Sequence, residues 1–314
     1  MRRRRVSAVQ PGECIGVISP YTGGGRLDGT EGKQVLEEMG FAVQMMPSAQ
    51  MRKDGLFLSS YELAKEIHHL SMNPDIKAIL CLGDGQGINR VIAELDYTVL
   101  KKNPKLFIGR GTATGMHIVL GERCGAMTAY GPMLCDFHAS MSEYTKRQFR
   151  DGVACAGVLG DLTMPGQCAL QSWKSGSWDG VVVGGRLGAL ASLAGTPYEL
   201  KGFNDILLLE EYGREPWEIE EDLYHLSQNG LFNRARAVVL GDFSSCKPKE
   251  SAETGVASID EVLHGFFETA EIPVLAGFAG GAVPEQAFLP LGVESRIVSR
   301  KQEEKITILV RYAK

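Results

Sequence analysis

The sequence predicts an α/β protein in which an N-terminal domain with a doubly wound parallel sheet and a second α/β domain enclose a cleft. The 314 residues are enough for two domains of ordinary size. Short apolar runs alternate with amphipathic stretches through the first half, and a region rich in tryptophan, glycine and serine at residues 151–180 separates this pattern from a second one. Alternating strands and helices favour parallel pairing, with sites at the carboxyl ends of the strands.

The N-terminal domain is predicted to span residues 1–150. Its apolar runs are bounded by Gly, Pro or Asp, as is typical of strands, and Ser59 or Ser60 is suited to cap the second helix. Strands are expected at residues 14–20, 41–46, 76–83 and 106–109, and helices at residues 32–39, 59–72, 87–95 and 114–120. Three loops, at residues 19–25, 83–87 and 109–112, should then meet at one edge of the sheet.

Residues 151–180 are expected to cross into the second domain, which is predicted to span residues 181–314. Their tryptophans, glycine-serine turns and proline are typical of a connecting segment. In the second domain, strands are expected at residues 181–186, 206–211, 237–243 and 272–277, helices near residues 217–228 and 259–269, and a terminal pair of strands that ends at residues 306–310.

The composition argues against several classes of protein. The formal net charge is -5, whereas nucleic-acid-binding domains are usually basic. The four arginines at residues 2–5 are expected to form a solvated terminus. No segment has the apolar length of a secretory signal or a membrane span, which predicts a cytoplasmic protein without membrane partners. Seven cysteines without a Cys-x-x-Cys pair are expected to be free thiols, and neither a metal site nor a cofactor is predicted.

Residues 108–114, Ile-Gly-Arg-Gly-Thr-Ala-Thr, end one predicted strand and begin a predicted helix. In α/β hydrolases such a turn carries the nucleophile, because it lifts one side chain into the cleft. The residue at the apex of this turn is Gly111, which has no side chain. The sequence therefore predicts an enzyme-like scaffold whose expected chemistry has been removed or replaced.

Seven motifs in one order connect this sequence with a known family. They lie at residues 11–20, 83–90, 103–109, 131–133, 184–198, 206–211 and 274–293. Together they resemble the LD-carboxypeptidase family, the serine peptidases that include muramoyl-tetrapeptide carboxypeptidases and microcin C self-immunity peptidases, and the resemblance covers nearly the whole chain. It supports the two-domain fold and suggests a homodimer.

The resemblance also implies where a catalytic serine, histidine and glutamate would lie. The serine position falls on Gly111, with Thr112 in place of the family's aspartate, and the histidine position falls on Ala282. Only the glutamate has a counterpart, Glu210. A hydrogen cannot attack a carbonyl, and a methyl group cannot move a proton, so an acyl-enzyme route through this degenerate triad is excluded.

Glu210 is the leading catalytic candidate, because it ends a strongly apolar run and should be partly desolvated, with a raised pKa. It could act as a general acid or base, or hold a substrate ammonium. A structural role as a hydrogen-bond acceptor is an equal alternative. Asp84 and Glu285 are possible replacement acids, and His117 is expected to be an ordinary helix histidine.

The predicted ligand contacts surround the elbow. Arg110 and Thr112 flank its apex, where backbone amides should bind an anion such as a carboxylate or phosphate. A solvent-facing Arg110 is the alternative. Three residues of the second glycine-rich loop and one at the end of a strand in the second domain complete the predicted set: Asp84, Gly85, Gln86 and Arg186.

Two functions compete for this scaffold, each with a small peptide-like or amino-acid-derived ligand. One is a repurposed enzyme, for example a cyclase, a lyase or an acyl-transfer catalyst, in which Glu210 transfers protons. The polar substitutions at Asp84, Arg110 and Thr112 favour it slightly. The other is a binding or immunity protein that sequesters its ligand. Residual carboxypeptidase or amidohydrolase activity, as in the family, is a third possibility.

Overall fold

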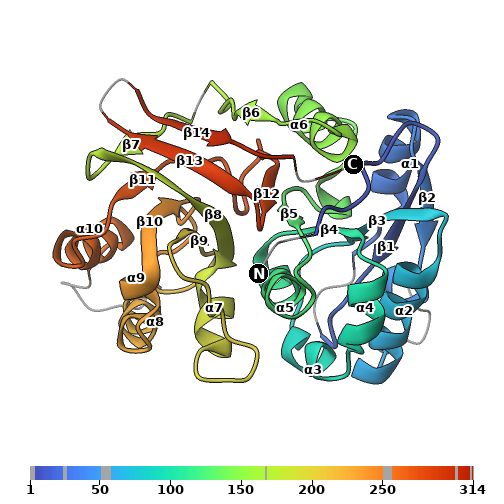
Figure 1. The fold of residues 1–314 in the computed structure, drawn as a ribbon, viewed down its shortest axis with the longest axis horizontal. Coiled ribbons are helices and arrows are strands. Elements are labelled where there is room, and N and C mark those ends of the chain that lie inside the picture. The colour runs from blue at the N-terminus through green and yellow to red at the C-terminus, as the bar shows by residue number, and fades with distance from the viewer. Residues whose placement is uncertain are drawn as a thin grey trace.

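The computed structural model describes residues 4–23, 27–50, 58–166, 168–249, 257–300, 303–311 and 313. Arg2 and Arg3 of the basic run, and Gly24 and Gly25 of the first glycine-rich loop, lie outside these ranges. Figure 1 shows two sheets flanked by helices, one formed mainly by the N-terminal half of the chain and the other by the C-terminal half. The predicted α/β fold with two sheets is confirmed.

The first sheet has six strands in the order β12-β5-β4-β3-β1-β2. Its five N-terminal strands pair in parallel, as predicted, and β12 adds an antiparallel edge. The central strand β4 is buried throughout, as expected of a parallel strand covered on both faces. The strands are β1 (Cys14–Ile18), β2 (Ala42–Met45), β3 (Ile76–Cys81), β4 (Leu106–Gly109), β5 (Thr128–Tyr130) and β12 (Leu289–Leu291).

The helices of this half lie where the apolar spacing predicts them, with α4 and α6 in addition. Ser59 is the N-cap of α2, because its hydroxyl accepts a hydrogen bond from the amide of Glu62 while the Glu62 carboxylate accepts one from the amide of Ser59. The helices are α1 (Thr30–Glu38), α2 (Ser60–Met72), α3 (Ile88–Ala93), α4 (Tyr97–Lys102), α5 (Thr114–Val119) and α6 (Glu143–Ala154), with short helical turns η1 (Pro47–Ala49), η2 (Gly111–Ala113), η3 (Leu120–Cys124) and η4 (Leu134–Asp136).

The second sheet is mixed, with eight strands in the order β6-β14-β13-β8-β9-β10-β11-β7. Strands β8 to β11 are parallel to one another and the remaining pairs are antiparallel. The strands are β6 (Gly160–Asp161), β7 (Gln171–Ser172), β8 (Gly176–Arg186), β9 (Asp205–Glu210), β10 (Ala235–Leu240), β11 (Val274–Ala276), β13 (Glu294–Ser299) and β14 (Lys305–Ile308). The helices are α7 (Leu187–Leu193), α8 (Pro216–Gln228), α9 (Leu231–Arg234) and α10 (Ile259–Thr269).

Strand β8 is longer than the sequence predicts, because it serves two neighbours. Its first half pairs antiparallel with β13, and its second half pairs in parallel with β9. In this second half Arg186 is the register partner of Glu210. The end of β8 therefore brings an arginine beside the glutamate that the sequence singles out.

The two sheets share their hydrophobic core. One core cluster contains Ile108 and Leu208, and the other contains Phe107 and Leu207, so each cluster includes strands of both sheets. Strand β12, from the C-terminal half, also completes the first sheet. Residues at the junction are consequently held between packed elements, which favours a preorganised site. The domain limits themselves stay a prediction.

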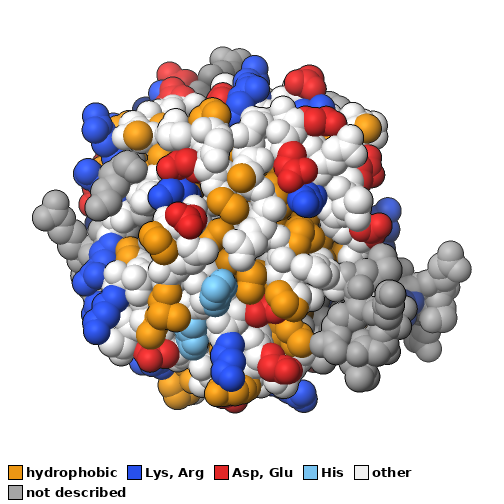
Figure 2. Space-filling view, turned by 90° about the vertical axis from the view of Figure 1, so that its right-hand side faces the viewer, with side chains coloured by type: hydrophobic (Ala, Val, Ile, Leu, Met, Phe, Trp, Pro, Cys, Tyr) orange, Lys and Arg blue, Asp and Glu red, His pale blue; other side chains and the backbone are white. Residues whose placement is uncertain are grey.

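The surface of the N-terminal half carries charged side chains of both signs interspersed with hydrophobic ones (Figure 2). Among the described residues, no helix combines the length and the apolar character needed to cross a bilayer. The seven cysteines, all within the described ranges, are free thiols.

Candidate functional site

The site begins at the sharp turn that follows β4. The turn η2 begins at Gly111, which has a φ of +62°, and α5 follows directly. This left-handed conformation suits glycine, which lacks a Cβ. The structure therefore contains the strand-turn-helix elbow that the sequence predicts, with glycine at its apex.

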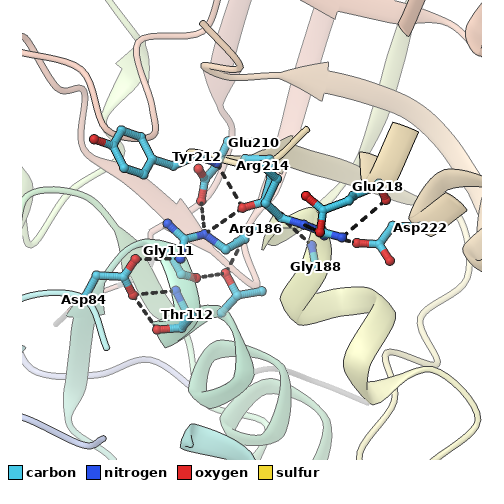
Figure 3. A network of polar contacts seen from close by, with 12 residues as sticks. Asp84, Gly111, Thr112, Arg186, Gly188, Glu210, Tyr212, Arg214, Glu218 and Asp222 are labelled. Atoms are coloured by element: carbon cyan, nitrogen blue, oxygen red, sulfur yellow. Dashed lines mark hydrogen bonds and ion pairs between the residues drawn. The ribbon is translucent and has the colours of Figure 1, made fainter. Parts of the chain in front are cut away.

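An ion pair covers the apex of the elbow. A Cβ added to Gly111 would lie 2.6 Å from Oδ2 of Asp84 and 3.0 Å from Nη2 of Arg186. Asp84 comes from the loop after β3, whereas Arg186 comes from the end of β8 in the second sheet, and Nη1 of Arg186 lies 2.6 Å from Oδ2 of Asp84. The space into which an elbow side chain would project is therefore filled by a contact between the two halves of the molecule (Figure 3).

The elbow itself holds the Asp84 carboxylate. Oδ1 of Asp84 accepts hydrogen bonds from the amides of Gly85, at 2.9 Å, and Thr112, at 3.1 Å. The hydroxyl of Thr112 donates to the same oxygen. Thr112 and the loop of Asp84 and Gly85, predicted as ligand contacts, thus lie together, and the carboxylate bound at the elbow is the protein's own.

Arg186 joins this carboxylate to two glutamates at the end of β9. Its Nε lies 3.2 Å from Oε1 of Glu211 and 3.9 Å from Oε1 of Glu210. The guanidinium thus extends from the elbow apex to Glu210 (Figure 3). The Arg186 guanidinium thus lies within ion-pair distance of three carboxylates, those of Asp84, Glu210 and Glu211.

Glu210 is almost completely buried, with 1% of its side chain exposed. Burial raises its pKa to about 7, although Arg186 and the nearby hydroxyl of Tyr130 oppose this shift. Oε1 of Glu210 and the hydroxyl of Tyr130 each lack a hydrogen-bond partner of regular geometry. The buried, weakly acidic carboxyl that the sequence predicts at this position is therefore present, with unused hydrogen-bonding capacity.

Glu211 is an organising residue that sequence reasoning did not select. Its carboxylate is equally buried and accepts hydrogen bonds from the amides of Gly188 and Tyr212, both at 2.9 Å. Arg214 lies 3.7 Å from Glu211 and pairs with Asp222 and Glu218. The feature of the sequence that could have identified Glu211 is the high density of charged residues directly after the apolar run of β9.

A groove opens beside this network, with a volume of about 610 Å³. Residues 84–89 and Thr112 line one side, and Arg186, Tyr212 and Arg214 line the other. Its size is within the range of small-molecule sites. Gln86, a predicted ligand contact, lines this groove together with Asp84, Gly85, Thr112 and Arg186. Among the described residues, no group of His, Cys, Asp and Glu side chains has the geometry to hold a metal ion.

Comparison with known proteins identifies the family. Residues 15–131 match the LD-carboxypeptidase N-terminal domain, and residues 179–297 match the LD-carboxypeptidase C-terminal domain. The chain belongs to the LD-carboxypeptidase family. A probable murein peptide carboxypeptidase of Bacillus subtilis is 27% identical over 297 residues, which cover 92% of this chain and 89% of the relative. The microcin C7 self-immunity protein MccF of Escherichia coli is 28% identical over 263 residues, or 75% of each chain.

Solved structures of this LD-carboxypeptidase family share the fold. MccF in complex with aspartyl sulfamoyl adenosine superposes with a TM-score of 0.87 at 25% identity, covering 99% of this chain and 100% of that one. The muramoyltetrapeptide carboxypeptidase from Oxalobacter formigenes gives a TM-score of 0.80 at 26% identity, covering 96% of this chain and 100% of that one. The relatives thus include carboxypeptidases and a self-immunity protein.

The loop that the family resemblance assigns to the histidine lies beside Glu210. A Cβ added to Gly281 would lie 3.4 Å from Oε2 of Glu210, and Ala282 follows directly. The sequence-predicted positions of the LD-carboxypeptidase triad, Gly111, Ala282 and Glu210, therefore converge on the junction of the two sheets. Arg186 supplies the cation there.

Glu210 lies outside the groove lining, and so do three other residues that the sequence singled out. Arg110 makes a two-pronged pair with Asp136, with distances of 2.7 and 3.3 Å, so its role in ligand binding stays a prediction. Glu285 acts electrostatically on Tyr144 and Cys168, and its role as a replacement acid is likewise still a prediction. His117 packs behind the elbow, where Nε2 lies 3.1 Å from the carbonyl oxygen of Gly109 and burial lowers its pKa to about 4.

Proposed function

We propose that this chain is a binding member of the LD-carboxypeptidase family, which holds a small amino-acid- or peptide-derived molecule in the groove without cleaving it by a serine mechanism. The observation that carries this proposal is the Asp84–Arg186 ion pair over Gly111. It occupies the space that an attacking side chain at the apex of the elbow would need.

The chemistry of the three triad positions supports the same conclusion. Gly111 offers no nucleophile and Ala282 offers no base. Arg186 spans the distance between the elbow and Glu210, but a guanidinium stays protonated at every accessible pH and cannot accept a proton from a hydroxyl. Serine acylation therefore has neither its attacking group nor its proton acceptor in this site.

The ligand class follows from the relatives and from the groove. MccF has been solved with aspartyl sulfamoyl adenosine, and curated relatives are named for murein peptides. The groove of this chain has the volume of a site for a compact molecule of that kind, and charged side chains lie at its floor. An immunity or carrier function would require the protein to sequester a compact molecule of this kind.

A second function, proton-transfer catalysis, is favoured by one observation. The pKa of Glu210 is about 7 because the carboxyl is buried, which is the range in which a general acid or base works best at neutral pH. A repurposed enzyme that uses Glu210 would need its substrate to reach beyond the groove lining to Oε1, which lacks a hydrogen-bond partner of regular geometry.

Binding and turnover can be measured on the same samples. We expect calorimetric titration with aspartyl sulfamoyl adenosine and with short murein peptides to detect a bound ligand, and mass spectrometry of the same mixtures to detect no product. A fluorophosphonate probe should leave the protein unlabelled. Labelling of a serine, or release of a carboxy-terminal amino acid, would show residual peptidase chemistry and overturn the proposal.

Glu210→Gln separates binding from proton-transfer catalysis. If the chain only binds, the variant changes affinity and no turnover exists to lose. If Glu210 transfers protons, any product formed by the wild type disappears while affinity is largely kept. Glu37→Gln, in the exposed i,i+4 pair with Lys33 on α1, is the matched control and should behave as the wild type.

A further inference from the structure

A second pocket lies at the opposite end of the strands of the second sheet from the groove. The groove lies where β8 and β9 end, whereas this pocket lies where the parallel strand β11 begins, between α10 and the segment that follows β7. Figure 1 shows α10, β7 and β11 on the side of the molecule away from the first sheet. We call it the α10 pocket, after the helix that contributes His264, Phe267 and Glu268 to its lining.

The α10 pocket has an apolar floor. Phe267, Ile272 and Val274 line it and are each at most 5% exposed. A ligand that covers these side chains removes their remaining apolar surface, and its own, from water, which favours binding. The volume of the pocket, about 390 Å³, is at the lower end of the range for small-molecule sites. The floor therefore suits a compact ligand with an apolar body.

One wall of the pocket is a pair of stacked rings. The ring centroids of Trp173 and His264 lie 3.8 Å apart, with an angle of 23° between the ring planes. The amide of Trp173 donates to the carbonyl of Val274 at 3.1 Å, and its side chain packs against the hydrophobic core. The wall is thus fixed by the backbone as well as by packing. Because the two rings are already in contact, a ligand lies against the stack and not between its rings.

Two opposite charges line the pocket without neutralising each other. Lys174 follows Trp173 directly, and Glu268 lies one turn after His264 on the same face of α10. The charges therefore flank the stack from the two elements that form it. Both residues are exposed, and within the part of the chain that the structure describes neither side chain forms a hydrogen bond or an ion pair. The pocket thus offers a ligand one free cation and one free anion.

We propose that the α10 pocket is a second binding site, which takes a free zwitterionic amino acid with a large apolar side chain. The apolar side chain covers Phe267 and Ile272, the carboxylate pairs with Lys174 and the ammonium pairs with Glu268. Only a ligand that carries one charge of each sign satisfies both residues. This inference concerns a different site from the groove and does not depend on the proposed function.

Four related compounds test the ligand class in the wild-type protein. Phenylalanine carries the apolar side chain and both charges, 3-phenylpropionate lacks the ammonium, phenethylamine lacks the carboxylate, and alanine lacks the large side chain. We expect NMR titration to show that phenylalanine binds roughly threefold to tenfold more tightly than either singly charged compound, since each loses one ion pair near the surface. Alanine should bind at least roughly tenfold more weakly, because it leaves the floor uncovered. The indole resonance of Trp173, assigned with Trp173→Phe, reports binding in this pocket.

Neutral variants of the two charged residues test their roles. Lys174→Gln should lower the affinity for phenylalanine roughly threefold to tenfold and leave that for phenethylamine nearly unchanged. Glu268→Gln should lower the affinity for phenylalanine by a similar factor and leave that for 3-phenylpropionate nearly unchanged. Because both side chains are exposed, we expect both variants to fold. Lys33→Gln, in the exposed pair on α1, is the matched control and should keep the wild-type ranking.

The possible outcomes separate this inference from the proposed function. Equal binding of phenylalanine and the singly charged compounds overturns the zwitterion preference, and so does a ranking that neither neutral variant changes. Absence of phenylalanine binding, or binding that leaves the Trp173 resonance unshifted, overturns the second site. Failure of aspartyl sulfamoyl adenosine and murein peptides to bind overturns only the function proposed for the groove.

Discussion

Gly111 determines which side chain the elbow of this family member can carry. Its φ of +62° suits glycine, and the Asp84–Arg186 pair fills the space beyond its Cα. Two separate costs therefore oppose a larger residue at the apex. One is the left-handed backbone conformation and the other is the contact with the ion pair.

These two costs can be measured separately. Gly213 has a similar φ of +70° but open space around an added Cβ, so Gly213→Ala should cost about 1 kcal/mol of unfolding free energy through the backbone alone. We expect Gly111→Ala to cost about 2–3 kcal/mol in urea denaturation, since the added methyl group also displaces Asp84. In an Asp84→Ser background, the extra cost of Gly111→Ala over Gly213→Ala should disappear. Equal losses in the two alanine variants would mean that the ion pair does not restrict the apex.

Glu210 should make stability depend on pH in a direction opposite to that of most carboxylates. Its pKa rises from 4.5 to about 7 on folding because it is buried, so between these values the native state holds a proton that the unfolded state has released. Stability therefore falls as pH rises through this window, by up to about 3 kcal/mol.

The measurement compares wild type with Glu210→Gln, which stays neutral. Urea denaturation between about pH 5 and about pH 8 should show a gain of the variant over the wild type that grows with pH. The exposed variant Glu37→Gln should run parallel to the wild type. A constant difference between Glu210→Gln and wild type across this range would contradict the raised pKa.

At the scale of elements, the elbow is supported from behind by Arg110 and Asp136. Their side chains are 11% and 15% exposed, and Asp136 also accepts a hydrogen bond from the amide of Met133 at 2.7 Å. This contact ties the turn after β4 to η4. Arg110, which the sequence predicts as a ligand contact, thus stabilises the elbow through its ion pair with Asp136.

The chain offers a matched pair of ion pairs that differ in burial. Asp179 and Arg296 have the same two-pronged geometry, but their side chains are 52% and 50% exposed. We expect Asp136→Asn to lower the unfolding free energy by about 2–3 kcal/mol, since it leaves a buried guanidinium unpaired, and Asp179→Asn to cost less than about 1 kcal/mol. Chemical denaturation would measure both. Similar losses would indicate that burial does not set the strength of these pairs.

At the scale of the whole molecule, Thr114 links the two sheets at the site. Its hydroxyl donates to the carbonyl of Gly111 at 2.6 Å and accepts from the amide of Arg186 at 2.9 Å, and the residue is fully buried. The elbow of the first sheet and the end of β8 in the second are therefore fixed relative to one another. This contact holds Arg186 in reach of Asp84.

Thr114→Val keeps the shape of the side chain and removes both hydrogen bonds. We expect a loss of about 2 kcal/mol in unfolding free energy, because one buried amide and one buried carbonyl lose a partner. The exposed Thr98, in the first turn of α4, is the control, and Thr98→Val should be nearly neutral. An unchanged unfolding midpoint for Thr114→Val would show that the hydrogen bonds of Thr114 do not help to hold the two sheets together.

Much of the architecture could be predicted from the sequence. The strand at residues 106–109 and the helix at residues 259–269 agree with β4 and α10, since apolar periodicity and glycine or serine boundaries are local properties. Strand β12 was missed, because its pairing with β5 joins residues far apart in the chain. The length of β8 was underestimated for the same reason.

The sequence by itself determined the family, the elbow with glycine at its apex and the buried glutamate at the end of β9. These follow from the order of residues along the chain. Only the tertiary structure decided that Asp84 and Arg186 close over Gly111, that Glu211 organises both arginines, and that Arg110 turns to Asp136. Side chains from distant segments pair according to where packed strands end in space, and spacing along the chain carries no information about such directions.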